Sequence, residues 1–324
     1  QKREGAVIIG LFGTPHTQAL TARLAEDKIP GTSPGFGSAL SADGKRYPYL
    51  FPIAASYWSQ MGGALQFAKQ QLGGSLQGKK IAYLMYDNPA GKEPLPVLEA
   101  IAKQEGFEYR VFAVPPPGVE MGAQILDLTQ RFRPDFVVTH LFGRAPSVSI
   151  RELKRTGYPL RKVVAMVWGG AEADIEAAGG YEAAEGYNTL QFAGVGSEFP
   201  VIREILNMYS AQGREPPREL RSTVMYNRGV LIAATHIEAI RNAIKLNGGK
   251  QPTGEDVKNG FEAIRDFSLG GLVPPLKITP EDHEGGGWVR VFRVTKTGFE
   301  PVGDWFRGFP EVLEKVLEAE ANKG

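Results

Sequence analysis

Short apolar runs and amphipathic segments of helical spacing alternate through the middle of this chain, with a repeat of about 25–30 residues. We predict strands at 80–86, 109–114, 136–141 and 162–168, and helices at 93–105, 121–133, 146–156 and 171–178. A short apolar run bounded by turn residues is typical of a buried parallel strand, and parallel strands are usually joined by a helix. The alternation therefore predicts an α/β protein with doubly wound parallel sheets.

The first strand and helix of this kind lie at the start of the chain. Ala6–Ile9 predicts a strand, Gly10–Gly13 a turn, and Thr14-Pro15-His16-Thr17 the first turn of a helix that continues to Asp27. Thr is a good N-cap, and Pro is common in a first helical turn. Such a helix start presents backbone N–H groups at the carboxyl edge of the sheet, where an anion is favoured. The same pattern also occurs in ordinary junctions that touch no ligand.

The composition restricts the class of protein. The 324 residues favour two domains, and 42% hydrophobic with 23% charged residues is typical of a globular protein. A net charge of +1 gives no reason to expect a nucleic-acid partner, and no apolar run reaches the roughly 18 residues that membrane insertion needs. The absence of cysteine excludes disulfides, thiolate metal sites and a cysteine nucleophile.

The two ends of the chain differ from its middle. No signal peptide is visible, and Gln1–Gly5 looks like the end of a preceding helix and turn, so we expect the chain to begin within a domain. Towards the end, we predict strands at 187–193, 276–279 and 288–294, helices at 199–212, 224–246, 257–264 and 310–321, and a hairpin turn at 296–298.

Motifs for catalysis, metals and cofactors are missing. The four histidines are isolated from one another, and no phosphate-binding glycine motif occurs, so we expect no metal and no cofactor. Asp282-His283-Glu284 predicts a solvated turn. Gly31-Thr32-Ser33-Pro34-Gly35 matches the nucleophile elbow of hydrolases, but Pro34 cannot supply the backbone N–H of the oxyanion hole. We therefore expect no catalytic residue.

Turns rich in small, polar or aromatic residues follow the predicted strands. They are Gly13–Thr17, Ser33–Ser38, Ser56–Trp58, Asp87–Ala90, His140–Arg144 and Trp168–Glu172. Ligand pockets combine backbone groups with aromatic walls, so this pattern indicates a binding protein. The aromatic candidates are Tyr57, Trp58, Phe142 and Trp168. Core packing is the alternative role for each of them.

Several short motifs, in this order, resemble those of type I periplasmic solute-binding proteins of the branched-chain amino acid (Leu/Ile/Val-binding) family, which serve ABC importers. They are Val7–Gly10 with Thr14–Gln18, Ile29-Pro30 with Ser33–Gly35, Tyr86–Gly91, Pro134–Val137, Ala184–Tyr187, and Phe299–Val302 before Asp304-Trp305. The resemblance covers essentially the whole chain. It implies two doubly wound lobes joined by three crossovers, residues 1–55 with 196–287 and residues 56–195 with 288–324, the first lobe lacking its initial strand–helix units.

The resemblance also implies where a ligand binds. Thr14, with the amides of His16 and Thr17 and the adjoining Pro15, would hold a carboxylate. The remaining implied contacts are Phe36 and Gly37 after the second strand, Tyr57 and Trp58 at the first crossover, and Asn88, Phe142, Gly143, Trp168 and Gly169 after later strands. A small carboxylate would be captured between the lobes by hinge closure, in the periplasm, and delivered to the membrane subunits of the importer.

Amino-acid binders of this family hold the ligand ammonium with an acid in the turn after Val167. Here that turn is Trp168–Ala171, and its first acid is Glu172. A buried ammonium without a carboxylate is costly, so we predict an aromatic acid first and an apolar or branched-chain amino acid second. A ligand-sensing regulator of the same fold, an amide or amino-acid sensor, is the alternative function, and an enzyme is a further one.

Overall fold

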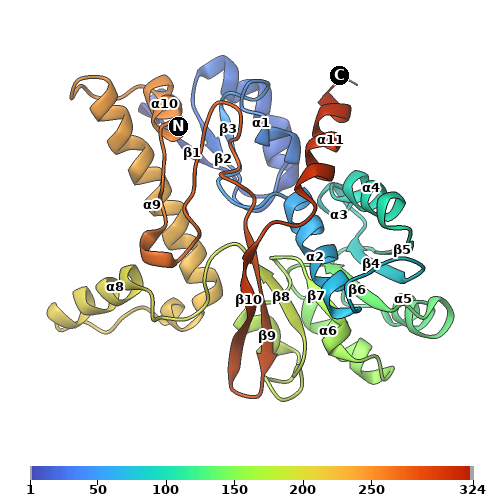
Figure 1. The fold of residues 1–324 in the computed structure, drawn as a ribbon. Coiled ribbons are helices and arrows are strands. Elements are labelled where there is room, and N and C mark those ends of the chain that lie inside the picture. The colour runs from blue at the N-terminus through green and yellow to red at the C-terminus, as the bar shows by residue number, and fades with distance from the viewer. Residues whose placement is uncertain (1, 322–324) are drawn as a thin grey trace. The chain divides into compact units, whose positions relative to one another are not determined.

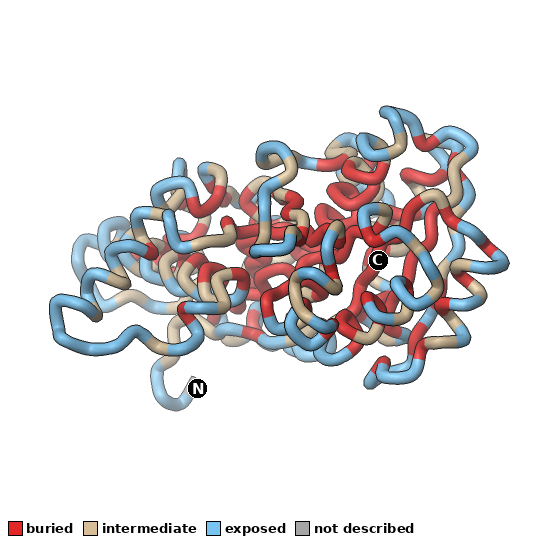
Figure 2. The backbone as a smooth tube through the Cα atoms, turned by 90° about the horizontal axis from the view of Figure 1, so that it is seen from below, coloured by how far each residue is buried: buried red, intermediate tan, exposed pale blue. Residues whose placement is uncertain are grey.

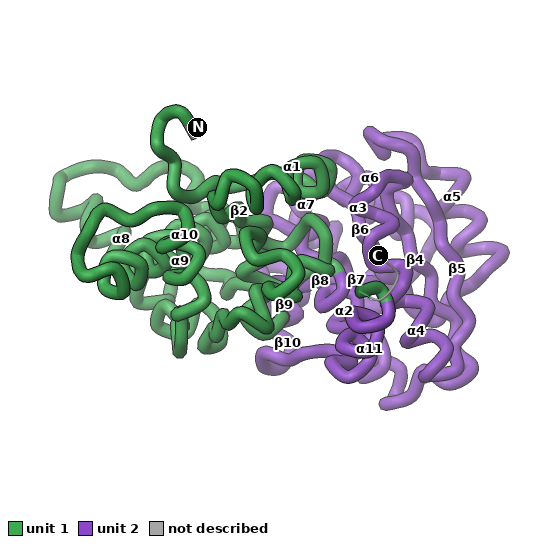
Figure 3. Tube along the Cα trace, turned by 90° about the horizontal axis from the view of Figure 1, so that it is seen from above, with its two compact units in different colours: residues 1–57, 192–288, 320–324 green, residues 58–191, 289–319 purple. Residues whose placement is uncertain are grey.

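The computed structural model describes residues 2–321, and the chain forms two compact units (Figures 1 and 3). Unit 1 comprises residues 1–57, 192–288 and 320–324, and unit 2 comprises residues 58–191 and 289–319. Each unit is therefore assembled from segments that lie far apart in the sequence.

Unit 2 contains a seven-stranded sheet with the order β10-β9-β8-β7-β6-β4-β5. Its strands are β4 (Lys80–Tyr86), β5 (Glu108–Val114), β6 (Phe136–His140), β7 (Val163–Ala165), β8 (Asn188–Gln191), β9 (Val289–Thr295) and β10 (Gly298–Phe306). The strands from β5 to β8 are parallel, whereas β8, β9 and β10 pair antiparallel. Because β4 pairs with both β5 and β6, the strand order reverses there, which is the switch point of a doubly wound sheet.

Helices connect these strands. They are α2 (Tyr57–Gln71), α3 (Pro89–Lys92), α4 (Leu95–Glu105), α5 (Gly122–Leu126) with the π-helical turn η3 (Asp127–Phe132), α6 (Ala145–Arg155), η4 (Leu160–Lys162), α7 (Glu172–Ala177) and α11 (Pro310–Ala321). In α4, Val97, Leu98 and Ile101 are buried at helical spacing, and Gly106 ends the helix at a φ of 71°. In Figure 2 such buried stretches alternate with exposed outer turns.

Unit 1 contains a smaller parallel sheet, β1 (Ile9–Gly10), β2 (Gly31–Thr32) and β3 (Leu50–Phe51), in that order. Its helices are η1 (Lys2–Glu4), α1 (Thr14–Asp27), η2 (Ala39–Ala42), α8 (Pro200–Ala211), η5 (Arg218–Arg221), α9 (Thr223–Leu246), α10 (Gly254–Glu262) and η6 (Leu269–Gly271). Phe51 and Phe261 stack with ring centroids 4.6 Å apart in a core that α9 and α10 share.

The predicted α/β fold is confirmed, and one local prediction is wrong. The strand predicted at 276–279 is absent, because Leu276 and Thr279 form only isolated bridges, with Phe267 and Asp282. The helix predicted at 121–133 is present as α5 and η3, and its geometry becomes π-helical at Asp127. Of the helices within residues 2–321, none combines the length and apolar character that crossing a bilayer requires.

The turn at 282–284 is not solvated as predicted, because His283 is fully buried. Its Nδ1 lies 2.9 Å from the Leu50 carbonyl oxygen and its Nε2 lies 3.1 Å from Glu262 Oε1. The imidazole also stacks on Phe51 at 3.9 Å between centroids. These partners come from other segments of the chain, so a charge run read locally could not reveal them.

Candidate functional site

The turn after β1 and the turn after β2 are joined by Thr14. Gly13, at a φ of 88°, is the N-cap of α1, and Thr14 is its first residue. Thr14 therefore lies in the first turn of the helix, as predicted, but is not its N-cap. Its hydroxyl oxygen instead accepts a hydrogen bond from the Gly37 amide at 3.2 Å, and the side chain is 2% exposed. Two residues of the predicted site, Thr14 and Gly37, are thus brought into contact.

Thr17 stabilises the same turn through two hydrogen bonds to Gly13. Its hydroxyl donates to the Gly13 carbonyl at 3.0 Å, and its amide donates to the same oxygen at 3.1 Å. The first hydrogen bond of α1 thus uses this amide, and its role in ligand binding stays a prediction. A Cβ on Gly37 would lie 2.9 Å from the Thr17 methyl carbon, and Gly37 has a φ of +88°. The turn therefore requires glycine.

Two amides and one hydroxyl at this sheet edge can serve a ligand. The amides of Thr14 and His16 lie in the first turn of α1, where no earlier helical carbonyl can accept from them. The Ser33 side chain is fully buried, and its Oγ has no hydrogen-bond partner among residues 2–321. This oxygen lies 3.2 Å from the position of a Cβ on Gly37. We call the two amides and the Ser33 hydroxyl the anion seat. Ser33 was missed as a site residue because only its burial reveals it.

Aromatic rings flank the anion seat. Phe36 is buried and contacts Phe12 edge-on, with centroids 6.3 Å apart. Phe12 itself is 82% exposed, an unusual state for a phenyl ring in a turn. Pro15 and His16 are also exposed. This edge of unit 1 therefore offers hydrogen-bond donors beside accessible apolar surface.

In unit 2, the turn after β4 leaves the sheet at its switch point. Open α/β sheets bind ligands at this position. Asn88 lies in the turn, and its Oδ1 accepts a hydrogen bond from the Gly91 amide at 2.9 Å, which caps α3. The side-chain nitrogen of Asn88 therefore remains as the group that can face a ligand.

The turn after β6 leaves the sheet beside it and contains Phe142 and Gly143. The Tyr86 hydroxyl lies 2.9 Å from the Phe142 carbonyl oxygen and 2.8 Å from that of Pro117. The rings of Tyr86 and Phe142 also meet edge-on, with centroids 4.6 Å apart. Tyr86 therefore positions the predicted site residue Phe142. Its place at the last position of β4 is the signal by which the sequence could have revealed it.

Trp168 and Gly169 lie in the turn after β7. Trp168 is half-buried, and the Tyr187 hydroxyl donates to the Gly169 carbonyl at 3.0 Å. Burial raises the pKa of Tyr187, so this hydroxyl remains a donor at neutral pH. Gly170 is also required, because a Cβ there would overlap the Thr189 side chain. Tyr187, directly before β8, and Thr189 within β8 thus fix the position of this turn.

Tyr57 and Trp58 are buried at the start of α2, with 3% and 5% exposure. The Trp58 indole N–H donates to the Glu93 carbonyl at 2.9 Å, a contact typical of core packing. Within unit 1, the Ser56 amide donates to the Glu284 carboxylate. The sequence predicted no acid at this crossover, because Glu284 is distant in the chain and reaches Ser56 only through folding.

His140 is fully buried and His236 is half-buried, and both are uncharged at neutral pH. Burial lowers the pKa of His140 to about 3, and the pKa of His236 to about 4. Their hydrogen-bond partners are the hydroxyls of Tyr83 and Thr32. Neither histidine can therefore pair with an anion at neutral pH. Within residues 2–321, no three His, Asp or Glu side chains converge in a way that could hold a metal ion.

The chain matches known proteins over most of its length. A family model described as periplasmic binding protein matches residues 1–299. No curated protein is matched. A structure titled as an ABC transporter permease from the Pseudomonas fluorescens group has 30% sequence identity and a TM-score of 0.89, and the match covers 98% of this chain and 78% of that one.

Two more distant structures share the fold. A branched-chain amino acid ABC transporter from Thermus thermophilus with bound valine has 22% identity and a TM-score of 0.80, with 96% of this chain and 80% of that chain covered. A fatty acid ABC transporter substrate-binding protein from Thermomonospora curvata has 17% identity and a TM-score of 0.76, with 94% and 75% covered.

Proposed function

The chain belongs to the periplasmic binding protein family, and we propose that it is the extracytoplasmic solute-binding component of an ABC importer. Its partners are then a small-molecule ligand and the membrane subunits of the importer, and its location is the periplasm. No bond is made or broken in this function. In this function the protein only binds the ligand and releases it.

The ligand in this proposal is a small carboxylate. The observation that carries it is the anion seat, where the Ser33 hydroxyl is buried without a partner among residues 2–321 beside the first turn of α1. A carboxylate would accept from that hydroxyl and from the amides of Thr14 and His16, and the helix N-terminus favours its charge. Such a ligand would satisfy a buried polar atom that the protein leaves unsatisfied.

An aromatic acid fits the surroundings best. Phe12 and Phe36 flank the anion seat, and Phe142 and Trp168 lie in the turns of unit 2 that follow β6 and β7. Aromatic rings bind one another edge-on or offset, which favours a ligand that carries a ring. The structures from Thermus thermophilus and Thermomonospora curvata are named for bound valine and for fatty acid, and each of these compounds combines a carboxylate with an apolar chain.

An apolar or branched-chain amino acid is the second candidate, and Glu284 is the observation that favours it. Its carboxylate accepts from the Ser56 amide at the first crossover and could also pair with a ligand ammonium. The two candidates therefore differ in whether an ammonium is needed for binding.

Hinge closure between the lobe of residues 1–55 with 196–287 and the lobe of residues 56–195 with 288–324 would follow binding. The carboxylate binds to the anion seat first, and Asn88, Phe142, Gly143, Trp168 and Gly169 then cover the rest of the ligand. Tyr57 and Trp58 lie where the chain crosses between lobes. The closed form is the state that the importer recognises.

Isothermal titration with benzoate, phenylalanine, leucine and valine tests this function. We expect benzoate to bind, and Ser33→Ala to weaken binding about tenfold or more, because a hydrogen bond to a charged group contributes about 1.5–3 kcal/mol. If leucine or valine binds and benzoate does not, the amino-acid candidate replaces the aromatic acid. If no carboxylate binds, the anion seat is not a carboxylate site.

Thr21→Val is the matched control. Thr21 lies one turn further along α1 and bonds only the Thr17 carbonyl, at 2.7 Å. Its substitution removes a hydroxyl from α1 without touching the anion seat. Equal losses of affinity in the Thr21→Val and Ser33→Ala variants would mean that the effect comes from a general loss of stability in unit 1 and not from ligand contact.

A further inference from the structure

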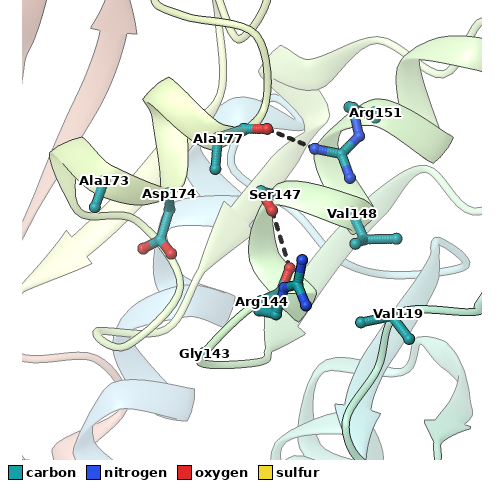
Figure 4. A pocket seen from close by; sticks show the side chains of 9 residues that line it. All are labelled: Val119, Gly143, Arg144, Ser147, Val148, Arg151, Ala173, Asp174 and Ala177. Atoms are coloured by element: carbon teal, nitrogen blue, oxygen red, sulfur yellow. Dashed lines mark hydrogen bonds between the residues drawn. The ribbon is translucent and has the colours of Figure 1, made fainter.

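A pocket of about 360 Å³ lies in unit 2 between α6 and α7. Figure 4 shows its lining side chains. They are Val119, Gly143, Arg144, Ser147, Val148, Arg151, Ala173, Asp174 and Ala177. A volume of a few hundred Å³ is typical of small-molecule sites. The pocket begins at Gly143, directly after the proposed contact Phe142.

Two guanidinium groups and one carboxylate set the charge of this pocket. The Asp174 carboxylate accepts from the Ala171 amide at 2.9 Å and thereby caps α7. Arg151 is held in place, because its Nη1 donates to the Ala177 carbonyl at 2.5 Å (Figure 4). The remaining N–H groups of that guanidinium are still donors.

Arg144 is the cation of this pocket that no residue within 2–321 pairs. It is exposed, and its guanidinium makes no hydrogen bond or ion pair with any of residues 2–321. The Ser147 hydroxyl donates to the main-chain carbonyl of Arg144, at 2.9 Å, and does not bond its guanidinium. The Arg144 side chain can therefore turn towards a ligand. Val119 and Val148 supply apolar walls, and Val119 is 43% exposed without a ligand to cover it.

We propose that this pocket binds an anionic group of a small ligand, with Arg144 and Arg151 as its cationic partners. Guanidinium groups recognise carboxylate and phosphate oxygens in pairs, and two of them outweigh the single carboxylate that already caps α7. The anion is either the second carboxylate of a captured dicarboxylate, which rests on the proposed function, or a separate small anion. Both have the same chemistry at the pocket.

Titrations at constant ionic strength with glutarate, butyrate and inorganic phosphate test the proposal in the wild type and in Arg144→Gln and Arg151→Gln. Arg131→Gln is the control, because Arg131 carries the same charge in unit 2, is 83% exposed and pairs only with Asp127. We expect Arg144→Gln to weaken glutarate or phosphate binding about tenfold or more, the usual effect of losing a charge-assisted bond, and Arg131→Gln to change it less than twofold.

The ligands distinguish the two sources of the anion. If Arg144→Gln weakens glutarate and leaves butyrate unchanged, the pocket holds the second carboxylate of the solute. If it weakens phosphate, and Ser33→Ala leaves phosphate unchanged, the pocket holds a separate anion.

Two results would overturn the proposal. One is an equal effect of Arg144→Gln and Arg131→Gln on glutarate and phosphate, and the other is no binding of either to the wild type. The proposed function fails separately, when neither benzoate nor butyrate nor any amino acid binds. Arg151→Gln also breaks the link to Ala177, so its thermal midpoint is measured alongside its affinity, and Arg144→Gln decides the outcome if that midpoint falls.

Discussion

The buried pair of His283 and Glu262 gives a prediction about stability. The His283 side chain is 0% exposed and that of Glu262 is 9% exposed. The imidazole lies between the Leu50 carbonyl and the Glu262 carboxylate, within hydrogen-bond distance of both, and stacks on Phe51. Lys258 reaches the other oxygen of Glu262 at 2.8 Å. We therefore predict that Glu262→Gln destabilises the protein.

The magnitude can be worked out from the two interactions that this substitution weakens. The hydrogen bond between His283 and Glu262 has a carboxylate as its acceptor in the interior and is worth about 1.5–3 kcal/mol. The pair with Lys258 on the same helix adds about 0.3–0.5 kcal/mol. Glutamine keeps an oxygen that can still accept from the ring, which limits the loss. We expect the unfolding free energy at pH 7 to fall by about 2–3 kcal/mol.

The pH dependence gives an independent check. Burial alone would raise the pKa of Glu262, but hydrogen bonds from His283 and Lys258 outweigh it, so the pKa lies below its ordinary value of 4.5. A carboxyl whose pKa is lowered by folding stabilises the protein above its unfolded pKa, and this stabilisation disappears as the pH falls through the folded pKa. The difference between wild type and Glu262→Gln should therefore shrink as the pH falls from about pH 5 towards about pH 3.

Urea unfolding followed by circular dichroism measures this difference at each pH. Glu255→Gln is the control, because Glu255 lies on the same helix and pairs with Lys28 at 3.0 Å, with both side chains more than half exposed. Because both charges are well solvated, we expect this exposed pair to contribute much less to stability. The reasoning is refuted if the two variants lose equal stability at pH 7, or if the Glu262→Gln deficit stays constant down to pH 3.

Two further predictions concern the turns of the site. Gly37→Ala should lower the unfolding free energy by about 1–3 kcal/mol, because the new methyl group would press on Thr17 at a positive φ. Gly73 has a φ of +86° and no atom within 4 Å of the new methyl group, so Gly73→Ala should lower the unfolding free energy by only about 1 kcal/mol, through backbone strain alone. Urea unfolding of both variants separates crowding from strain. Tyr187→Phe should lose about 1–2 kcal/mol in the same assay, since the Gly169 carbonyl is left without its donor, and an unchanged midpoint would show that water replaces the hydroxyl.

The sequence predicts the elements of unit 2 well, since long strands and amphipathic helices carry a periodic signal. β4 matches its predicted bounds, and α4 begins two residues after its predicted start. The elements of unit 1 are harder to predict, because β1 and β3 are two residues long and too short to show an alternation of apolar and polar residues. Their pairing is decided by contacts between distant segments.

The sequence predicts which turns form the candidate site, but not which group in each turn faces a ligand and which bonds the protein itself. The helix start identifies Thr14, but its partner Gly37 lies 23 residues further along the chain. The buried hydroxyl of Ser33 and the carboxylate of Glu284 depend on burial and long-range contact. Local patterns report which backbone turns face the sheet edge, whereas the direction of each side chain depends on the packing beneath it.

The proposed site gains its rigidity by using polar side chains inside the protein. Thr14 bonds Gly37, Asn88 caps α3, and Tyr86 holds the Phe142 carbonyl, so none of these groups needs to be ordered when a ligand arrives. Ordering side chains at an interface costs about 0.5–1.5 kcal/mol each, so a preformed site retains more of its binding energy. The remaining donors are few, which means that discrimination between carboxylates must come from the aromatic rings and from unpaired cations such as Arg144.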